Sequence, residues 1–155
     1  MIKPLSLAAA VAAALLMQAC ATPGQPTVTH LNSGKVLPTG LPFSEAVRVG
    51  DTVYLSGQIG NMPGPGPIKL APGGMPGEAT QVMDNIKTAL EAHGLSMGDV
   101  VKCTVMLADM KEWGAFNDVY KTYFSGHFPA RSAFGSNGLA FNARVEVECI
   151  AVARK

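Results

Sequence analysis

The fold is decided near the C-terminus, where the chain reads Arg144-Val145-Glu146-Val147-Glu148-Cys149-Ile150-Ala151-Val152. Apolar and charged residues alternate over most of this stretch, a pattern typical of a β-strand whose two faces have different surroundings. One face carries Val145, Val147, Cys149 and Ala151, and the other carries Arg144, Glu146 and Glu148. We expect helices to cover the apolar face. The second face, which also carries Ile150 and Val152, should meet water or another copy of the chain.

The remaining sequence adds strands and helices in a βαβ pattern. The expected strands span 27–31, 44–49, 52–56, 100–108, 130–134 and 143–153, and the expected helices span 79–90 and 113–124. Gly50-Asp51 is a hairpin turn signal, and Gly94 is a left-handed stop for the first helix. Asp109 and Glu112 have capping-box spacing before the second helix, whose aromatic stripe we attribute to the core. Residues 61–77 contain five Pro and five Gly and predict a surface loop.

Residues 1–19 are predicted to be a signal peptide of the lipoprotein type. A cationic start precedes an apolar run over 5–17, which is too short to span a bilayer as a stable helix, and small residues lead to Cys20. Cys20 resembles a bacterial lipoprotein acceptor and is expected to be lipidated; a simple cleaved signal and an uncleaved anchor are the alternatives. Residues 20–26 would then tether one domain, 27–155, exported to the periplasm and anchored in a membrane by its lipid.

Two cysteines remain if Cys20 carries a lipid, and they would lie in a compartment that permits disulfides. Both Cys103 and Cys149 fall on apolar strand faces, and we expect buried thiols. A bridge requires Cα atoms within about 7 Å, a distance that the sequence does not give. No zinc site is expected, because His30, His93 and His127 are far apart in the sequence and have no Cys nearby.

Size and charge narrow the class of protein. A chain of 155 residues suits a single core. The formal net charge is +1 and Lys and Arg do not cluster, which argues against a nucleic-acid partner held through counterion release. A hydrophobic fraction of 48% with only 15% charged residues indicates extra buried surface, part of it in the leader and part in a subunit interface.

A second stretch, Phe128-Pro129-Ala130-Arg131-Ser132, carries the candidate chemistry. Proline restricts the backbone just before Arg131, whose planar guanidinium matches a carboxylate at two points. Spacing alone favours a structural ion pair between Arg131 and Glu146 or Glu148. Either glutamate is also a candidate base for a bound water, and the residues alone do not choose between them.

These stretches resemble the RidA/YjgF family of reactive enamine/imine deaminases. The resemblance runs from Pro42 to the C-terminus, matches poorly between 60 and 77, and includes Ser56-Gly57-Gln58, Asn85, Gly94-Leu95, Val101-Lys102 and Asn117 in the family's order. It implies an α+β, chorismate-mutase-like fold: one mixed sheet of about six strands with two α-helices on one face. It also implies a homotrimer with active sites in clefts between subunits, and no metal or organic cofactor.

The function implied by this resemblance is hydrolytic deamination of 2-aminoacrylate-like enamines and imines to 2-oxo acids and ammonia. Arg131 matches the residue that binds the substrate carboxylate, and Glu146 matches the residue that positions the hydrolytic water. The expected substrate-binding residues are Phe43, Ser56, Gly57, Asn117 and Ala133.

Two positions depart from the family's pattern. Phe43 stands where the archetypal deaminases carry Tyr, and Ala133 stands where many members carry Cys. Both changes remove a polar group from the expected pocket and leave the rate and the substrate range open. The alternative function is a non-catalytic, trimeric binding or chaperone-like module in the periplasm. A nuclease is a third option, disfavoured by the lack of a basic groove.

Overall fold

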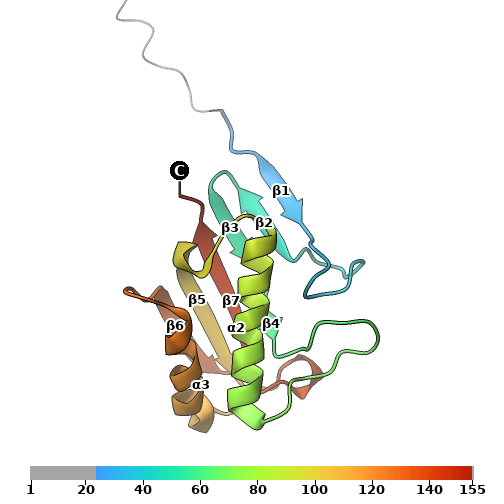
Figure 1. Cartoon of the computed structure of the whole chain (residues 1–155), viewed down its shortest axis with the longest axis vertical. Helices are drawn as coiled ribbons and strands as arrows, with labels where there is room; N and C mark the ends of the chain where they lie inside the picture. The colour runs from blue at the N-terminus through green and yellow to red at the C-terminus, as the bar shows by residue number, and fades with distance from the viewer. Residues whose placement is uncertain (1–23, 155) are drawn as a thin grey trace, which may run out of the picture.

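Residues 24–154 are described by the computed structural model and form one seven-stranded mixed sheet (Figure 1). The signal peptide expected over 1–19 and the expected lipidation site, Cys20, lie outside the described residues. The strands are β1 Val28–Leu31, β2 Ala46–Val49, β3 Thr52–Leu55, β4 Gln58–Ile59, β5 Val100–Leu107, β6 Ala130–Gly135 and β7 Val145–Val152. Their order is β1-β2-β3-β7-β5-β6, with β4 also paired to β7. Neighbouring strands are antiparallel except β5 and β6, which are parallel.

Two α-helices cover the same face of this sheet. Helix α2, Gly74–Ala92, packs against β7 and β4, and α3, Trp113–Tyr120, packs beside α2 (Figure 1). Short 3₁₀ turns lie at Met97–Asp99, Met110–Glu112, Lys121–Tyr123 and Ala140–Asn142. The predicted α+β class and the placement of both helices on one face are therefore confirmed. In residues 24–154, no helix combines the length and the apolar character that crossing a membrane requires.

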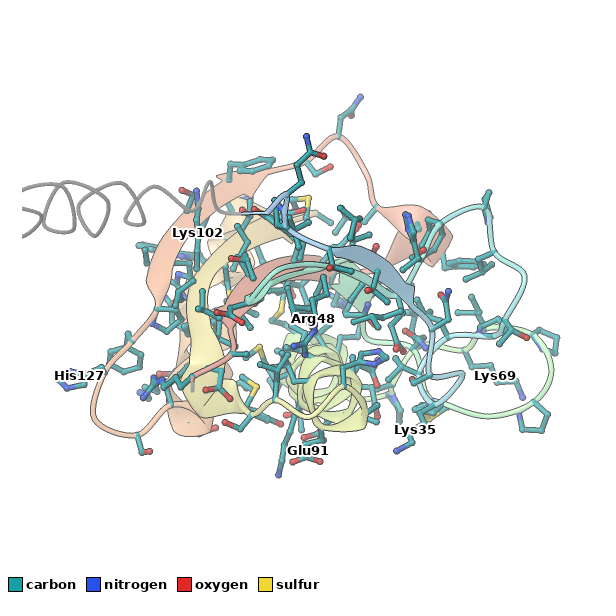
Figure 2. All side chains as sticks on the ribbon, turned by 90° about the horizontal axis from the view of Figure 1, so that it is seen from above. Lys35, Arg48, Lys69, Glu91, Lys102 and His127 are labelled. Atoms are coloured by element: carbon teal, nitrogen blue, oxygen red, sulfur yellow. A yellow bond between two sulfur atoms is a disulfide. The ribbon has the colours of Figure 1, made fainter. Side chains whose placement is uncertain are left out.

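The core lies between the helices and the sheet, and strand β7 shows how the sequence pattern makes it. Val145, Val147 and Ala151 are fully buried in one cluster with the apolar face of α2. Glu146 and Glu148 alternate with these residues and point to the opposite face. Lys102 of β5 lies on that open side, away from α2 (Figure 2). The alternation along the last strand therefore predicts both faces correctly from Val145 onward.

The predicted loop over 61–77 ends earlier than expected, because α2 already begins at Gly74. Pro76 lies in the first turn of the helix, where the backbone N–H groups have no intrahelical acceptor, so proline costs no hydrogen bond there. The base of the loop is pinned, since the Met62 N–H donates to the Lys69 carbonyl at 2.9 Å. The irregular segment is thus shorter and better anchored than its composition indicates.

The expected capping box at Asp109 and Glu112 is only half formed. The Asp109 side chain accepts from the Lys111 N–H at 2.9 Å, but the Glu112 carboxylate binds Nη1 of Arg144 at 2.7 Å instead of turning back. Arg144 also lies 3.7 Å from Glu78 of α2. The expectation that Arg144 shares the open face with Glu146 is therefore wrong, because β7 begins only after it.

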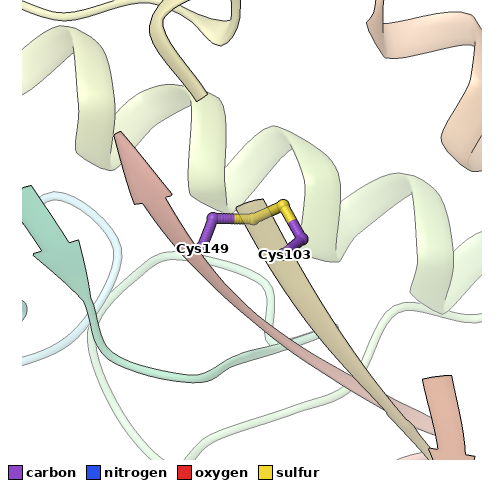
Figure 3. The surroundings of a disulfide bond; sticks show 2 residues. All are labelled: Cys103 and Cys149. Carbon is purple, nitrogen blue, oxygen red and sulfur yellow. A yellow bond between two sulfur atoms is a disulfide. The ribbon is translucent and has the colours of Figure 1, made fainter. Parts of the chain in front are cut away.

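The two cysteines form a disulfide, so the expectation of free buried thiols is wrong. Cys103 of β5 lies directly opposite Cys149 of β7 in the antiparallel register, and their Cα atoms are 4.1 Å apart (Figure 3). Directly opposed residues on neighbouring antiparallel strands come close enough for such a bond. Both residues are at most 2% exposed, within the core cluster.

Candidate functional site

Arg131 lies on the edge strand β6 and points to the face covered by the helices. It is in parallel register with the buried Cys103, and its guanidinium carbon lies 4.6 Å from the ring centroid of Tyr120 and 5.9 Å from that of Phe116, both on α3. The guanidinium makes no hydrogen bond or ion pair with any other residue of 24–154. The structural ion pair with Glu146 or Glu148 that spacing favours is therefore absent from this part of the chain.

A cleft of about 300 Å³ opens beside this guanidinium. Its lining comes from α3, the turn after it and the start of β6: Asn117, Tyr120, Lys121, Phe128, Pro129 and Arg131. The structure thus brings the predicted substrate-binding residue Asn117 next to Arg131. Ala133, two residues further along β6, points to the same face and packs against the core. Most of the cleft wall is apolar. Of its two cations, Lys121 is paired with Asp118 at 2.8 Å, so the Arg131 guanidinium is the group that would select a ligand.

Glu146 lies on the open face of β7, next to the backbone of Gly57. A Cβ atom at Gly57 would overlap Oε1 of Glu146, so only glycine lets the carboxylate occupy this place. Burial, and secondarily the charge of Glu148, raise the pKa of Glu146 above its usual value. A carboxylate with a raised pKa is a stronger base, which suits proton transfer to or from a water.

Two further predicted residues lie on the Gly57 side. The Ser56 hydroxyl donates to the Ser44 carbonyl at 2.7 Å, and the Ser56 N–H donates to the Glu45 carbonyl at 3.0 Å. The hydroxyl proton of Ser56 is thus used within the fold, and its oxygen remains as an acceptor. Phe43 stands just before Ser44 and is 49% exposed.

The candidate residues therefore form two groups on opposite faces of the sheet. The first group is Asn117, Arg131 and Ala133, and the second is Gly57 and Glu146. Ser56 directly precedes Gly57, and Phe43 lies before Ser44, which accepts the hydrogen bond from Ser56. Strand register explains the separation. Arg131 aligns with Cys103, and Cys103 aligns with Cys149, so these three side chains point to the same face. Glu146 precedes Cys149 by an odd number of residues on the same strand, and its side chain therefore points to the opposite face. Within one chain, the structure does not place the guanidinium beside the carboxylate.

Sequence reasoning missed Tyr120 and Lys121 of the Arg131 cleft, whereas Phe128 and Pro129 belong to the stretch that it singled out. The aromatic spacing on α3 was attributed to the core, and Tyr120 is indeed only 4% exposed. Its second contact, with Arg131, depends on how α3 packs over β6, and no local pattern encodes that packing.

Residues 24–154 contain no group of three or more His, Cys, Asp or Glu side chains arranged to hold a metal ion.

The described residues form a small α+β domain: a mixed sheet carries two helices on one face, an arginine without an ionic partner among these residues at its edge, and a glutamate on its open face. The family described as Endoribonuclease L-PSP, to which the RidA/YjgF proteins belong, matches residues 35–153. The chain belongs to this family.

Similar proteins agree with this assignment. The mouse and goat proteins named 2-iminobutanoate/2-iminopropanoate deaminase are 48% and 49% identical over 111 residues; the match covers 72% of this chain and 81% and 80% of those proteins. The crystal structure of E. coli TdcF with bound serine superposes with a TM-score of 0.73 at 31% identity, covering 81% of this chain and 99% of TdcF. The resemblance derived from short motifs is thus confirmed, and the family match extends over residues 35–153.

Proposed function

We propose that this protein hydrolyses reactive 2-imino acids, and the 2-enamino acids that tautomerise to them, to 2-oxo acids and ammonia. The observation that carries the proposal is the Arg131 guanidinium, which has no ionic partner within residues 24–154 and faces a largely apolar cleft. An unpaired planar cation in such a place suits a carboxylate ligand. The names of the mouse and goat relatives and the serine bound to TdcF support a substrate with an amino-acid skeleton.

The proposed mechanism divides the work between two side chains. Arg131 binds the carboxylate of the imine, and Glu146 accepts a proton from water as the water oxygen forms a bond to the imine carbon. Glu146 passes that proton to the imine nitrogen as the C=N double bond becomes single, which gives a neutral carbinolamine. The carbinolamine hydroxyl then gives up its proton to the nitrogen, by way of Glu146 or water, as the C–N bond breaks and the C=O bond forms, so that ammonia and the 2-oxo acid are released. Positioning and one base are sufficient chemistry, because the imine carbon is already electrophilic.

This division requires a second copy of the chain, since Arg131 and Glu146 lie on opposite faces of one sheet. In a homotrimer, a cleft between subunits would combine Arg131 and Asn117 of one subunit with Gly57 and Glu146 of its neighbour. The open face supports such an assembly, because β7 places Ile150 and Val152 there, next along the strand after Glu146 and Glu148. Repeating one heterologous contact around a three-fold axis closes the ring.

Imine decay tests the proposal. An amino-acid oxidase generates the 2-imino acid in situ, and trapping with semicarbazide measures how fast it disappears. We expect Arg131→Ala to lower kcat/KM about 100-fold, the value of a charge-assisted contact. Arg154→Ala is the matched control, because Arg154 is exposed and its ion pair is with Asp99. Decay that wild type does not accelerate, or that Arg131→Ala accelerates equally, contradicts the proposal. Ligand-induced thermal stabilisation without turnover would instead indicate a binding module.

Mixing variants tests the shared site directly. Arg131→Ala and Glu146→Gln should each have little activity alone. Unfolded together and refolded at equal amounts, they should recover about a quarter of the wild-type activity, because one interface in four then combines an intact Arg131 with an intact Glu146. No recovery in refolded oligomers of the correct size would show that one chain supplies both groups.

We also propose that the chain is exported and anchored through a lipid on Cys20. The leader over 1–19 supports this, and so does the Cys103–Cys149 disulfide, because such bonds persist mainly in oxidising compartments. Mass analysis of the protein purified from membranes is the test. A mature chain that begins with a diacylglyceryl-modified Cys20 is expected, and an unmodified Met1 would refute export by this signal.

A further inference from the structure

A row of four aromatic rings runs from α3 to the start of β6 and lies next to the Arg131 guanidinium. Successive ring centroids are 5.5 Å apart for Phe116 and Tyr120, 4.8 Å for Tyr120 and Phe124, and 6.2 Å for Phe124 and Phe128. The first three residues are spaced by four along the chain, which places them on one side of α3 and the turn that follows it. Tyr120 is the ring in the row that lies nearest to the guanidinium.

The contact between Arg131 and Tyr120 has the geometry of a cation–π interaction. The guanidinium carbon is 4.6 Å from the ring centroid of Tyr120, well inside the range of about 6 Å over which such contacts attract. The Phe116 ring, at 5.9 Å, lies at the outer limit of that range. Tyr120 is only 4% exposed, so the ring is shielded from water, and the attraction is strongest under that condition.

Arg131 has few other restraints on its long side chain. Within residues 24–154 no carboxylate or carbonyl accepts a hydrogen bond from its guanidinium. An unrestrained arginine would lose much of its rotamer freedom on binding a ligand, and the ligand affinity would fall accordingly. Stacking on a fixed ring removes that freedom in advance and leaves the edges of the guanidinium, which carry the N–H donors, available to a carboxylate.

We infer that Tyr120 is a positioning residue for the proposed reaction: its ring holds the Arg131 guanidinium in the orientation that receives the substrate carboxylate. This inference rests on the proposed function, because it assumes that Arg131 binds the carboxylate. It assigns the role to the face of the ring, and the hydroxyl group has no part in it.

The hydroxyl group of Tyr120 can be removed without the ring, so the role of the ring can be tested separately from a hydrogen-bonding role of the hydroxyl. It is buried and has no hydrogen-bond partner among the described residues. Burial raises its pKa to about 12, while the nearby Arg131 opposes this shift, so the phenol stays neutral at any physiological pH. Replacing Tyr120 by Phe removes an unpaired buried hydroxyl and keeps the ring, and we therefore expect Tyr120→Phe to fold and to bind substrate as wild type does.

Fluorination of the ring at position 120 is the decisive experiment. Phe and its mono-, di- and trifluorinated analogues are incorporated in place of Tyr120, which keeps the ring shape and progressively weakens its negative face. We expect KM for the imine to rise stepwise to about tenfold, with kcat nearly constant, because the carboxylate contact is the same in ground state and transition state. Tyr120→Leu should show at least the same rise in KM.

The same series at Phe124 is the matched control, because Phe124 packs against Tyr120 but not against the guanidinium in the described structure. KM should not change along that series. An unchanged KM along the Tyr120 series, or a loss with Tyr120→Phe as large as with Tyr120→Leu, overturns the inference. The proposed function fails separately, if Arg131→Ala keeps wild-type kcat/KM in the same assay.

Discussion

Reducing the Cys103–Cys149 disulfide should destabilise the protein strongly. The bond joins residues 46 positions apart, across the neighbouring strands β5 and β7. In the chain-entropy model, opening a loop of this size gives the unfolded chain about 4 kcal/mol of additional conformational freedom. With a denaturant dependence of about 2 kcal/mol per molar urea, the unfolding midpoint should fall by about 2 M.

Equilibrium unfolding in urea, followed by tryptophan fluorescence, measures this shift. The sulfurs are buried, so the reductant must be added to unfolded protein before refolding. The Cys103→Ala/Cys149→Ala variant is the control, and its midpoint should not respond to reductant. All curves need one protein concentration, because association with other subunits also changes the apparent stability.

Two results would refute this reasoning. Oxidised and reduced wild type could unfold at the same urea concentration, which would mean that the bond adds no net stability. Alternatively, thiol titration of the unreduced, unfolded protein could find both cysteines free, which would mean that β5 and β7 are joined only by hydrogen bonds and packing.

Three further predictions follow from single side chains. Glu148 contributes to the raised pKa of Glu146, so Glu148→Gln should lower that pKa and move the acidic limb of the kcat/KM profile to lower pH; an unmoved limb contradicts the coupling. Gly57→Ala should displace the Glu146 carboxylate and lower kcat at least about tenfold, with little change in the urea midpoint, because a flexible side-chain end can move aside. The buried amide of Asn85 donates to the carbonyls of Ile59 (3.1 Å) and Asn61 (2.9 Å). Asn85→Ala should therefore cost about 2–3 kcal/mol of unfolding free energy, measured by denaturation, and a smaller loss would mean that water replaces the amide.

The fold was predictable wherever one element carries its own periodicity. Strand β7 alternates residue by residue, and α2 repeats its apolar residues every three or four positions, so each pattern identifies both the element and its buried face. Strand β4 was missed because two residues are too short to show any period. The start of α2 was missed because Gly73, Gly74 and Pro76 have the composition of a loop, although glycine and proline are tolerated in a first helical turn.

The site was less predictable, because its geometry depends on pairing between distant strands. The family resemblance assigns carboxylate binding to Arg131 and base catalysis to Glu146, but the sequence gives no register between β5, β6 and β7. That register decides that Cys103 faces Cys149, which makes the disulfide, and that Arg131 and Glu146 face opposite ways. The contact of Tyr120 with Arg131 has the same origin, since it requires α3 to pack over β6.

Because Arg131 and Glu146 point to opposite faces of the sheet, activity by the proposed mechanism depends on assembly of several subunits. On the proposed mechanism, a folded single chain would bind a carboxylate at Arg131 and hold a base at Glu146. The sheet separates these two side chains, so the single chain would not position water on the bound imine. The unpaired edge of β6 and the open face of β7 are both surfaces that the chain's own helices leave uncovered. On the proposed mechanism, the contact that covers the apolar residues of the open face would also bring one subunit's arginine to its neighbour's glutamate. Burial of apolar surface would then stabilise the catalytic arrangement, and selection for a stable oligomer and for a complete active site would act on the same residues.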